Sequence, residues 1–261
     1  MKTEYKTMMI EMDGHTAVMT INSGPVPVVN PQMLDDLEDA LKELSADKEV
    51  WALVISSSAE KIFLAGADVK QFLFSGRFEN MRFSARNHKV FGDLAAFPHP
   101  VICAVNGLAL GGGLELAISC DLRVMDKRAK VGFPEGGLGI APGAGGTQRL
   151  SRLIGVGKAK YLIYTAKQIR AEEAYAFGLC EVLAEPGECL AEAKRLALTI
   201  CANSPKAIAA DKQMIDLGIE QNMETGLLIE RNLGSDVFET KDKAEGAAAF
   251  KEKRKAVFKN E

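Results

Sequence analysis

The sequence has few cysteines, and none lies in a pattern that builds a disulfide framework or a zinc site. The five cysteines are an odd number, are scattered along the chain and include no C-x-x-C pair. A disulfide-stapled secreted fold and a structural metal site are therefore not expected, and we expect a reducing, cytoplasmic environment instead.

Long apolar runs are also absent. No stretch approaches the roughly 20 apolar residues that a helix needs to span a bilayer. The first residues include Glu4, Glu11 and Asp13, which argues against a secretory or organellar targeting segment. We therefore expect a complete, soluble chain with no membrane partner.

An excess of charge of one sign is lacking too. The 32 basic and 35 acidic residues give a net charge of -3, so no whole-molecule field favours nucleic acid or an anionic membrane. The 261 residues are 47% hydrophobic, which is enough to bury a full core. The composition indicates a folded domain in which any anion site is local.

Hydrophobic periodicity predicts strands in the first two thirds of the chain. Residues 8 to 21 favour a hairpin around Asp13-Gly14, a common two-residue turn. Residues 51–55 and 101–105 are continuous apolar runs, typical of strands covered on both faces, and 122–125 is a weaker example.

Helical patterns lie between these strands. Asn30 can cap a helix that begins at Pro31, and a second helix is predicted over 77–97. This alternation indicates an α/β core domain over residues 1–185. From residue 186 to 261 only helical patterns remain, which predicts a helical C-terminal extension.

Two glycine-rich stretches, 107–115 and 136–147, are candidates for chemistry. The dinucleotide pattern fails in the second stretch, where Pro142 stands at the third glycine position, and the P-loop-like segment at 152–159 has Arg152 and Ala159 at required positions. The first stretch follows a strand and leads into a helical segment, so its backbone N–H groups can hold a developing oxyanion.

Each stretch carries a glutamate. Glu115 would lie in the first turn of a helix, where it can equally be a residue that compensates the helix dipole. Glu135 follows Pro134 and precedes glycines, where an isolated glutamate is usually just solvated. Together the pair is also a candidate for acid/base chemistry, and spacing alone leaves both interpretations open.

Three motifs resemble the enoyl-CoA hydratase/isomerase (crotonase) superfamily in order and spacing. They are Lys61-Ile-Phe-Leu-Ala-Gly-Ala-Asp68, the stretch from Ala104 to Ala117 that contains Gly111-Gly-Gly-Leu-Glu115, and the stretch from Phe133-Pro-Glu135 to Leu150. The resemblance covers nearly the whole chain. It implies a spiral of ββα units with a helical C-terminal region that takes part in assembly into trimers or hexamers.

The resemblance also implies roles for individual residues. By position, the backbone N–H groups of Ala65 and Gly112 would form an oxyanion hole, and Ala65, Gly66, Ala67 and Asp68 would line the coenzyme A site together with Gly112. Glu115 and Glu135 fall on the two catalytic carboxylates of hydratases, and Gly143 falls where a backbone N–H holds the catalytic water.

These parts suit the reversible addition of water across a 2-enoyl-CoA thioester to give 3-hydroxyacyl-CoA. Two donors stabilise the enolate oxygen while one carboxylate activates water and the other protonates the α-carbon. We place water activation on Glu115 and α-protonation on Glu135. Acyl-CoA is the expected partner, and no separate cofactor or metal is expected.

Two alternatives remain open. A 3-enoyl to 2-enoyl-CoA isomerase needs the oxyanion hole but only one carboxylate, and a non-catalytic RNA-binding or scaffold member is compatible with the fold alone. The balanced charge disfavours RNA. One departure from the family stands beside Glu135, where Gly136 replaces a branched apolar residue and is predicted to leave room for a substituted acyl group.

Overall fold

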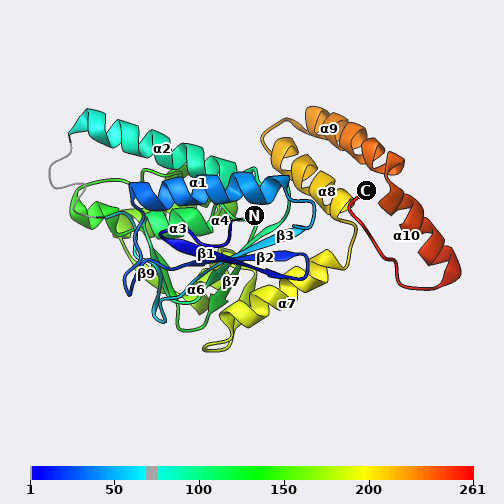
Figure 1. The fold of residues 1–261 in the computed structure, drawn as a ribbon. Helices are drawn as coiled ribbons and strands as arrows, with labels where there is room; N and C mark the ends of the chain where they lie inside the picture. Colours follow the sequence, from blue (N-terminus) through cyan, green and yellow to red (C-terminus); the bar gives the residue numbers. More distant parts are fainter. Residues whose placement is uncertain (1, 69–75) are drawn as a thin grey trace.

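The computed structural model describes residues 2–68 and 76–261, and its strands form two sheets (Figure 1). The larger sheet has the order β1-β2-β3-β5-β7-β10 and the smaller sheet has the order β4-β6-β8-β9. The strands of the larger sheet are β1 (Met8–Asp13), β2 (Thr16–Ile21), β3 (Ala52–Ser57), β5 (Val101–Val105), β7 (Leu122–Asp126) and β10 (Val182–Ala184). Those of the smaller sheet are β4 (Ile62–Leu64), β6 (Leu108–Leu110), β8 (Lys130–Gly132) and β9 (Gln168–Arg170).

From β3 to β8, consecutive strands alternate between the two sheets. β3, β5 and β7 pair in parallel in the larger sheet, and each is followed by a strand of the smaller sheet, β4, β6 or β8. Helices follow these strand pairs: α2 (Arg77–Ala95), α3 (Gly112–Ala117), and the 3-10 helix η2 (Pro134–Leu138) with α4 (Gly146–Ile154). This succession is the predicted spiral of ββα units, and the α/β prediction is confirmed.

The predicted hairpin is present with its turn displaced by one residue. Asp13 pairs with Thr16, so the two-residue loop consists of Gly14 and His15 rather than Asp13 and Gly14. Gly14 supplies the positive φ of 59° that the turn needs. The His15 ring stacks on Trp51 at 3.6 Å between ring centroids, a contact that favours placing His15 in the loop.

Helix α1 (Pro31–Ala46) begins as predicted. The Asn30 side chain accepts a hydrogen bond from the Met33 N–H, and Pro31 occupies the first turn, where it costs no backbone bond. The apolar face of α1 is buried, including Leu34, Leu37 and Leu41. That face fixes α1 on the main core and presents Val29, the residue before the cap, to the site described below.

Helix α7 (Cys189–Cys201) belongs to the core by its packing. Cys189, Ala193 and Ala197 pack with buried residues of the larger sheet in a second, smaller apolar cluster. The predicted boundary between 185 and 186 would separate α7 from the sheet that it covers. The amphipathic pattern of α7 reveals a buried face but not the surface that buries it.

The remaining helices bury little of their own surface. They are α8 (Pro205–Gly218), α9 (Met223–Asp236), the 3-10 helix η3 (Val237–Glu239) and α10 (Lys241–Glu252), and Figure 1 shows α9 and α10 to one side of the sheets. No residue of α9 is buried. Large exposed apolar side chains on these elements and on the residue after α8 are Ile215, Leu217, Ile219, Met223, Leu227, Leu228, Phe238 and Phe250. Within residues 2–68 and 76–261, no helix combines the length and apolar character that crossing a membrane requires.

Candidate active site

A cavity of about 590 Å³ lies among α2, α3, η2 and the loop that leads into α4. Both glutamates line it, and so do Ala65–Ala67, Gly112 and Gly143, so the structure brings most of the predicted site residues together. Asp68 does not line the cavity. Its backbone N–H donates to the Val29 carbonyl at 3.1 Å. The other lining residues are Val29, Gly76, Arg77, Asn80, Phe83, Ser84, Asn87, Gly111, Pro134, Leu138, Ile140, Ala141, Pro142 and Ala144.

Glu115 lies in α3 with only 3% of its surface exposed. Its Oε1 accepts hydrogen bonds from the backbone N–H groups of Ala144 and Gly146, each at 2.7 Å. Burial raises the pKa of Glu115, while these two bonds and the Arg149 charge oppose the rise. The carboxyl group is therefore fixed in orientation by donors that favour its ionised form.

Glu135 is buried in η2, where Pro134 starts the turn. Its Oε2 has no hydrogen-bond partner among the described residues. The carboxyl group lies over Gly111, because a Cβ added there would come within 2.6 Å of Oε1. Burial, with a smaller contribution from the Glu115 charge, raises the pKa of Glu135 to about 7, although a hydrogen bond from its own backbone opposes the rise. Near neutral pH this carboxyl group is therefore protonated in a substantial fraction of molecules.

The pair of backbone donors differs from the predicted pair at one position. The Ala65 N–H donates to the Pro27 carbonyl at 2.9 Å and is therefore engaged within the protein. The Ala67 N–H has no backbone acceptor within the described part of the chain, and it lies 3.5 Å from where a Cβ on Gly112 would stand. The Ala65 N–H is therefore not free to take its predicted role, and the Ala67 N–H, two residues along the same motif, lies beside Gly112 instead.

The bridge between Val29 and Ala67 explains this difference. Residues 65–68 run beside the segment before α1, so that the N–H groups of Ala65 and Asp68 donate to its carbonyls. Gly66 adopts a φ of +106°, which turns the chain between them. A motif match does not reveal which N–H groups are already hydrogen-bonded within such a bridge.

Gly143 lines the cavity, but the N–H groups that hold Glu115 belong to its neighbours. The Gly143 carbonyl accepts from the Ser84 hydroxyl at 2.5 Å, and its N–H has no acceptor among the residues described. Ala144 and Gly146 were not predicted as site residues. The start of α4 just after Gly145 was the available signal, since the first N–H groups of a helix lack helical partners.

Arg149 is a further residue that the sequence did not single out. Its guanidinium packs over Gly145, where φ is +106°, and donates to the Phe91 carbonyl at 3.4 Å. The Glu115 charge opposes the lowering that burial imposes on the Arg149 pKa. Arg149 therefore adds positive potential behind the donors of Glu115.

Gly136 does not lie where the sequence placed it. It is not part of the cavity lining, and a Cβ there would meet the Ile163 carbonyl of α5 (Val156–Thr165) at an ordinary 3.6 Å. The prediction that Gly136 enlarges the acyl pocket is not supported, because η2 turns this residue toward α5. No three His, Cys, Asp or Glu side chains group as metal ligands within residues 2–68 and 76–261.

The chain belongs to the enoyl-CoA hydratase/isomerase family, whose model matches residues 11–261. The sequence is 42% identical over 259 residues to a short-chain-enoyl-CoA hydratase of Clostridium acetobutylicum, covering 98% of this chain and 99% of that protein. It is 41% identical over 255 residues to a crotonyl-CoA hydratase of Syntrophomonas wolfei, covering 97% and 98% of the two chains.

Solved structures agree with the fold. An enoyl-CoA hydratase from Bacillus anthracis superposes with a TM-score of 0.94 at 35% identity, covering 98% of this chain and 100% of the other. An enoyl-CoA hydratase from Geobacillus kaustophilus gives a TM-score of 0.96 at 27% identity, with 99% and 98% covered. The resemblance stated from the motifs is thereby confirmed.

Proposed function

We propose that this protein is an enoyl-CoA hydratase that adds water reversibly across the 2,3 double bond of a 2-enoyl-CoA thioester. The observation that carries the proposal is a cavity in which two buried glutamates with different surroundings lie beside free backbone donors. Full-length similarity to proteins named as hydratases of short-chain and crotonyl thioesters supports the same reaction.

The donors suit a thioester carbonyl. We assign the enolate oxygen to the N–H groups of Ala67 and Gly112, which approach each other at the start of α3. Negative charge develops on this oxygen when water attacks the β-carbon, and preorganised N–H groups stabilise it more than the ground state. Ala65, Gly66 and Gly112 line the same region and are proposed to contact the coenzyme A thioester.

The two carboxyl groups suit opposite proton transfers. Glu115 accepts two N–H bonds that favour its ionised form, so it is the better base toward water, which the Gly143 N–H can help to hold. Glu135 has one carboxyl oxygen, Oε2, without a hydrogen-bond partner among the described residues and a pKa of about 7, so it can supply the α-proton. In dehydration the roles exchange. Neither step calls for a cofactor beyond coenzyme A.

We infer that the protein assembles with further copies of itself, as a trimer or a pair of trimers. Apolar side chains on α8–α10 are exposed in the single chain, with Ile219 at 76% and Met223 at 77%. Exposed apolar side chains that gather into a patch mark interfaces, and a copy of the same chain would cover them. Light scattering tests the assembly. A cytoplasmic location and the absence of a nucleic-acid partner remain proposals that rest on composition.

The deciding experiment offers purified protein crotonyl-CoA and, separately, a 3-enoyl-CoA thioester. A hydratase removes the conjugated enoyl chromophore of the first and incorporates ¹⁸O from labelled water into the 3-hydroxy product. An isomerase instead converts the second to a conjugated enoyl thioester without ¹⁸O. Inactivity toward both, with coenzyme A thioesters failing to bind in calorimetry, would favour the non-catalytic alternative.

A further inference from the structure

One peptide group connects helix α2 to the carboxylate of Glu115. The carbonyl of the peptide between Gly143 and Ala144 accepts from the Ser84 hydroxyl at 2.5 Å. The N–H of that same peptide donates to Glu115 Oε1 at 2.7 Å. Ser84 thus reaches the carboxylate through a single planar amide, whose two ends are fixed relative to each other by resonance.

We propose that Ser84 is a positioning residue for Glu115, which fixes and polarises the Gly143–Ala144 peptide that holds the carboxylate. The inference rests on the proposed role of Glu115 as the base toward water. The serine acts through the amide and has no part in the bonds that form or break.

Two physical effects follow from the arrangement. A hydrogen bond to an amide oxygen shifts electron density toward that oxygen and makes the N–H of the same amide a stronger donor. The bond also sets the rotation of the peptide plane in a loop that contains two glycines, Gly143 and Gly145, which restrict the backbone little. Losing the hydroxyl therefore weakens the Ala144 bond and loosens its direction.

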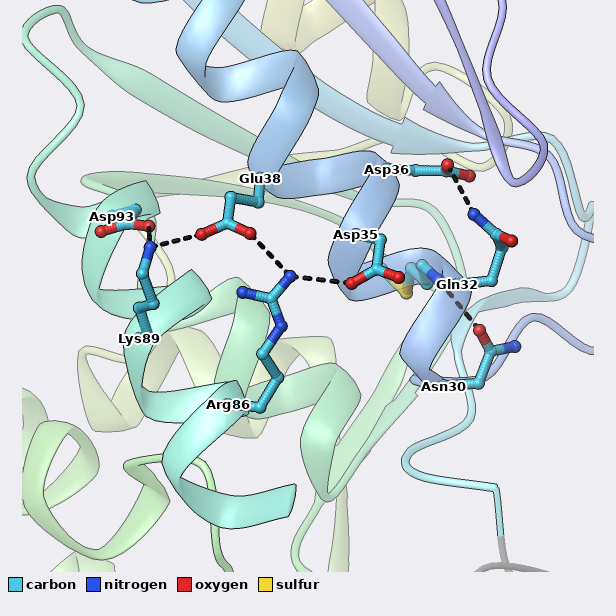
Figure 2. A network of polar contacts seen from close by, with 9 residues as sticks. Asn30, Gln32, Asp35, Asp36, Glu38, Arg86, Lys89 and Asp93 are labelled. Atoms are coloured by element: carbon cyan, nitrogen blue, oxygen red, sulfur yellow. Dashed lines mark hydrogen bonds and ion pairs between the residues drawn. The ribbon is translucent and has the colours of Figure 1, made fainter. Parts of the chain in front are cut away.

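Helix α2 is held firmly enough to act as this support. Figure 2 shows Arg86 of α2 between Asp35 and Glu38 of α1, at 2.8 and 2.6 Å. Lys89, one turn further, contacts Glu38 and lies 2.8 Å from Asp93. These ion pairs begin two residues after Ser84, so the register of α2 on α1 also fixes where the serine hydroxyl lies.

The groups facing Glu115 define what a titration should report. Glu135 of η2 and Arg149 of α4 act on it with opposite signs, and Arg77 of α2 lines the same cavity. A variant at Ser84 leaves all three charges in place. A change in the titration of Glu115 in that variant therefore reports the lost hydrogen bond to the Gly143–Ala144 peptide rather than a lost charge.

The test compares Ser84→Ala, which removes the donor, with Ser84→Thr, which keeps a hydroxyl. Ser45→Ala is the matched control, because Ser45 also donates to a backbone carbonyl, that of Lys42 at 3.0 Å, but lies on α1 away from the cavity. We expect Ser84→Ala to lower kcat for crotonyl-CoA by about 3- to 10-fold with KM nearly unchanged, the effect of one ordinary hydrogen bond. The acid limb of the pH profile should move up by roughly 0.3 to 1 unit. Ser84→Thr should recover most of the loss.

A second readout does not depend on turnover. The carbon-13 carboxyl resonance of Glu115, assigned with Glu115→Gln, should titrate at higher pH in Ser84→Ala than in the wild type and in Ser45→Ala. If wild type fails to hydrate crotonyl-CoA but the titration shifts, the proposed reaction fails and the positioning role stands. An unshifted titration in folded Ser84→Ala, a change confined to KM, or equal loss in the alanine and threonine variants would overturn the inference.

Discussion

The surroundings of Glu115 and Glu135 differ although both residues face one cavity. Around Glu115, the loop before α4 supplies two N–H donors and Arg149 adds a positive charge. The Glu135 carboxyl group lies over Gly111, and its Oε2 has no hydrogen-bond partner among the described residues. The two side chains are chemically identical, but hydrogen-bond donors favour the ionised form of Glu115, whereas burial raises the pKa of Glu135 to about 7; such a difference suits paired acid/base chemistry.

The strongest test of this comparison removes each carboxylate in turn. Glu115→Gln and Glu135→Gln should each lower hydration of crotonyl-CoA by about 10²- to 10⁴-fold, the range for positioned acid/base groups. The double variant should lose less than the product of the two, because a group that acts in concert contributes little once its partner is gone. Steady-state rates measure all three, with circular dichroism to check folding.

Near-normal hydration by either single variant would contradict the two-carboxylate mechanism. An isomerase would respond differently, because one glutamate would carry the proton between carbons. Removing the other would then barely change isomerisation of a 3-enoyl-CoA.

A second test removes a backbone donor of the proposed oxyanion site, which lies beside the two carboxylates. Gly112→Pro deletes one N–H proposed to bind the enolate oxygen and should lower kcat by about 10²- to 10³-fold. Gly112 is the first residue of α3, a position where proline fits a helix. Gly112→Ala is the control, since it adds a Cβ against Val29 at 3.3 Å but keeps the N–H. Equal losses in both variants would indicate steric damage instead.

A third test measures how hydration depends on pH, and so on the protonation of Glu135. Because Glu135 must be protonated for hydration and its pKa is about 7, kcat/KM for hydration should fall above that pH, by up to tenfold per unit. The fold favours the protonated form, so its stabilising contribution is full below pH about 4.5 and is lost as pH rises through about 7.

The difference in stability between wild type and Glu135→Gln measures the same pKa independently of turnover. Glu135→Gln lacks this titration. Between pH 5 and 8, the free energy of unfolding of wild type should therefore fall by roughly 1 to 2 kcal/mol relative to that of the variant. Urea unfolding at several pH values measures it. A difference that stays constant with pH would contradict the raised pKa.

The smallest effect is expected outside the cavity. Gly136→Val should leave the ratio of rates for crotonyl-CoA and a branched enoyl-CoA within about twofold, because Gly136 faces α5 and a Cβ there meets only ordinary contact. Rates with both thioesters decide it. A selective loss on the branched substrate would restore the idea that Gly136 shapes the acyl pocket.

The sequence predicted the fold and the family better than it predicted individual contacts. Apolar runs identified β3, β5 and β7 because strands buried on both faces must be continuously apolar. Position in a motif identified Glu115 and Glu135, but not that Ala65 is bonded to Pro27. Backbone pairing between distant segments leaves no mark on residue type, since every residue except proline carries the same N–H.

The cavity also contains residues whose contacts could not be predicted from the sequence pattern around them. Ser84 resembles any polar residue on a helix, and only the approach of α2 to residues 143 and 144 gives its hydroxyl a partner. The course of the loop before α4 decides that contact. Sequence spacing within α2 says nothing about that loop.

Three glycines around the site have main chain where a side chain would stand. A Cβ on Gly113 would overlap the Leu64 carbonyl, one on Gly107 the Lys61 carbonyl, and one on Gly132 would come within 2.5 Å of the Lys167 carbonyl. Alanine substitutions at these glycines would therefore displace the main chain rather than test a role in catalysis. Loss of activity at these glycines would reflect unfolding, and the N–H groups proposed to bind the enolate oxygen would survive every substitution except proline. Of the groups proposed to act on the substrate, only the two glutamates would register as chemistry.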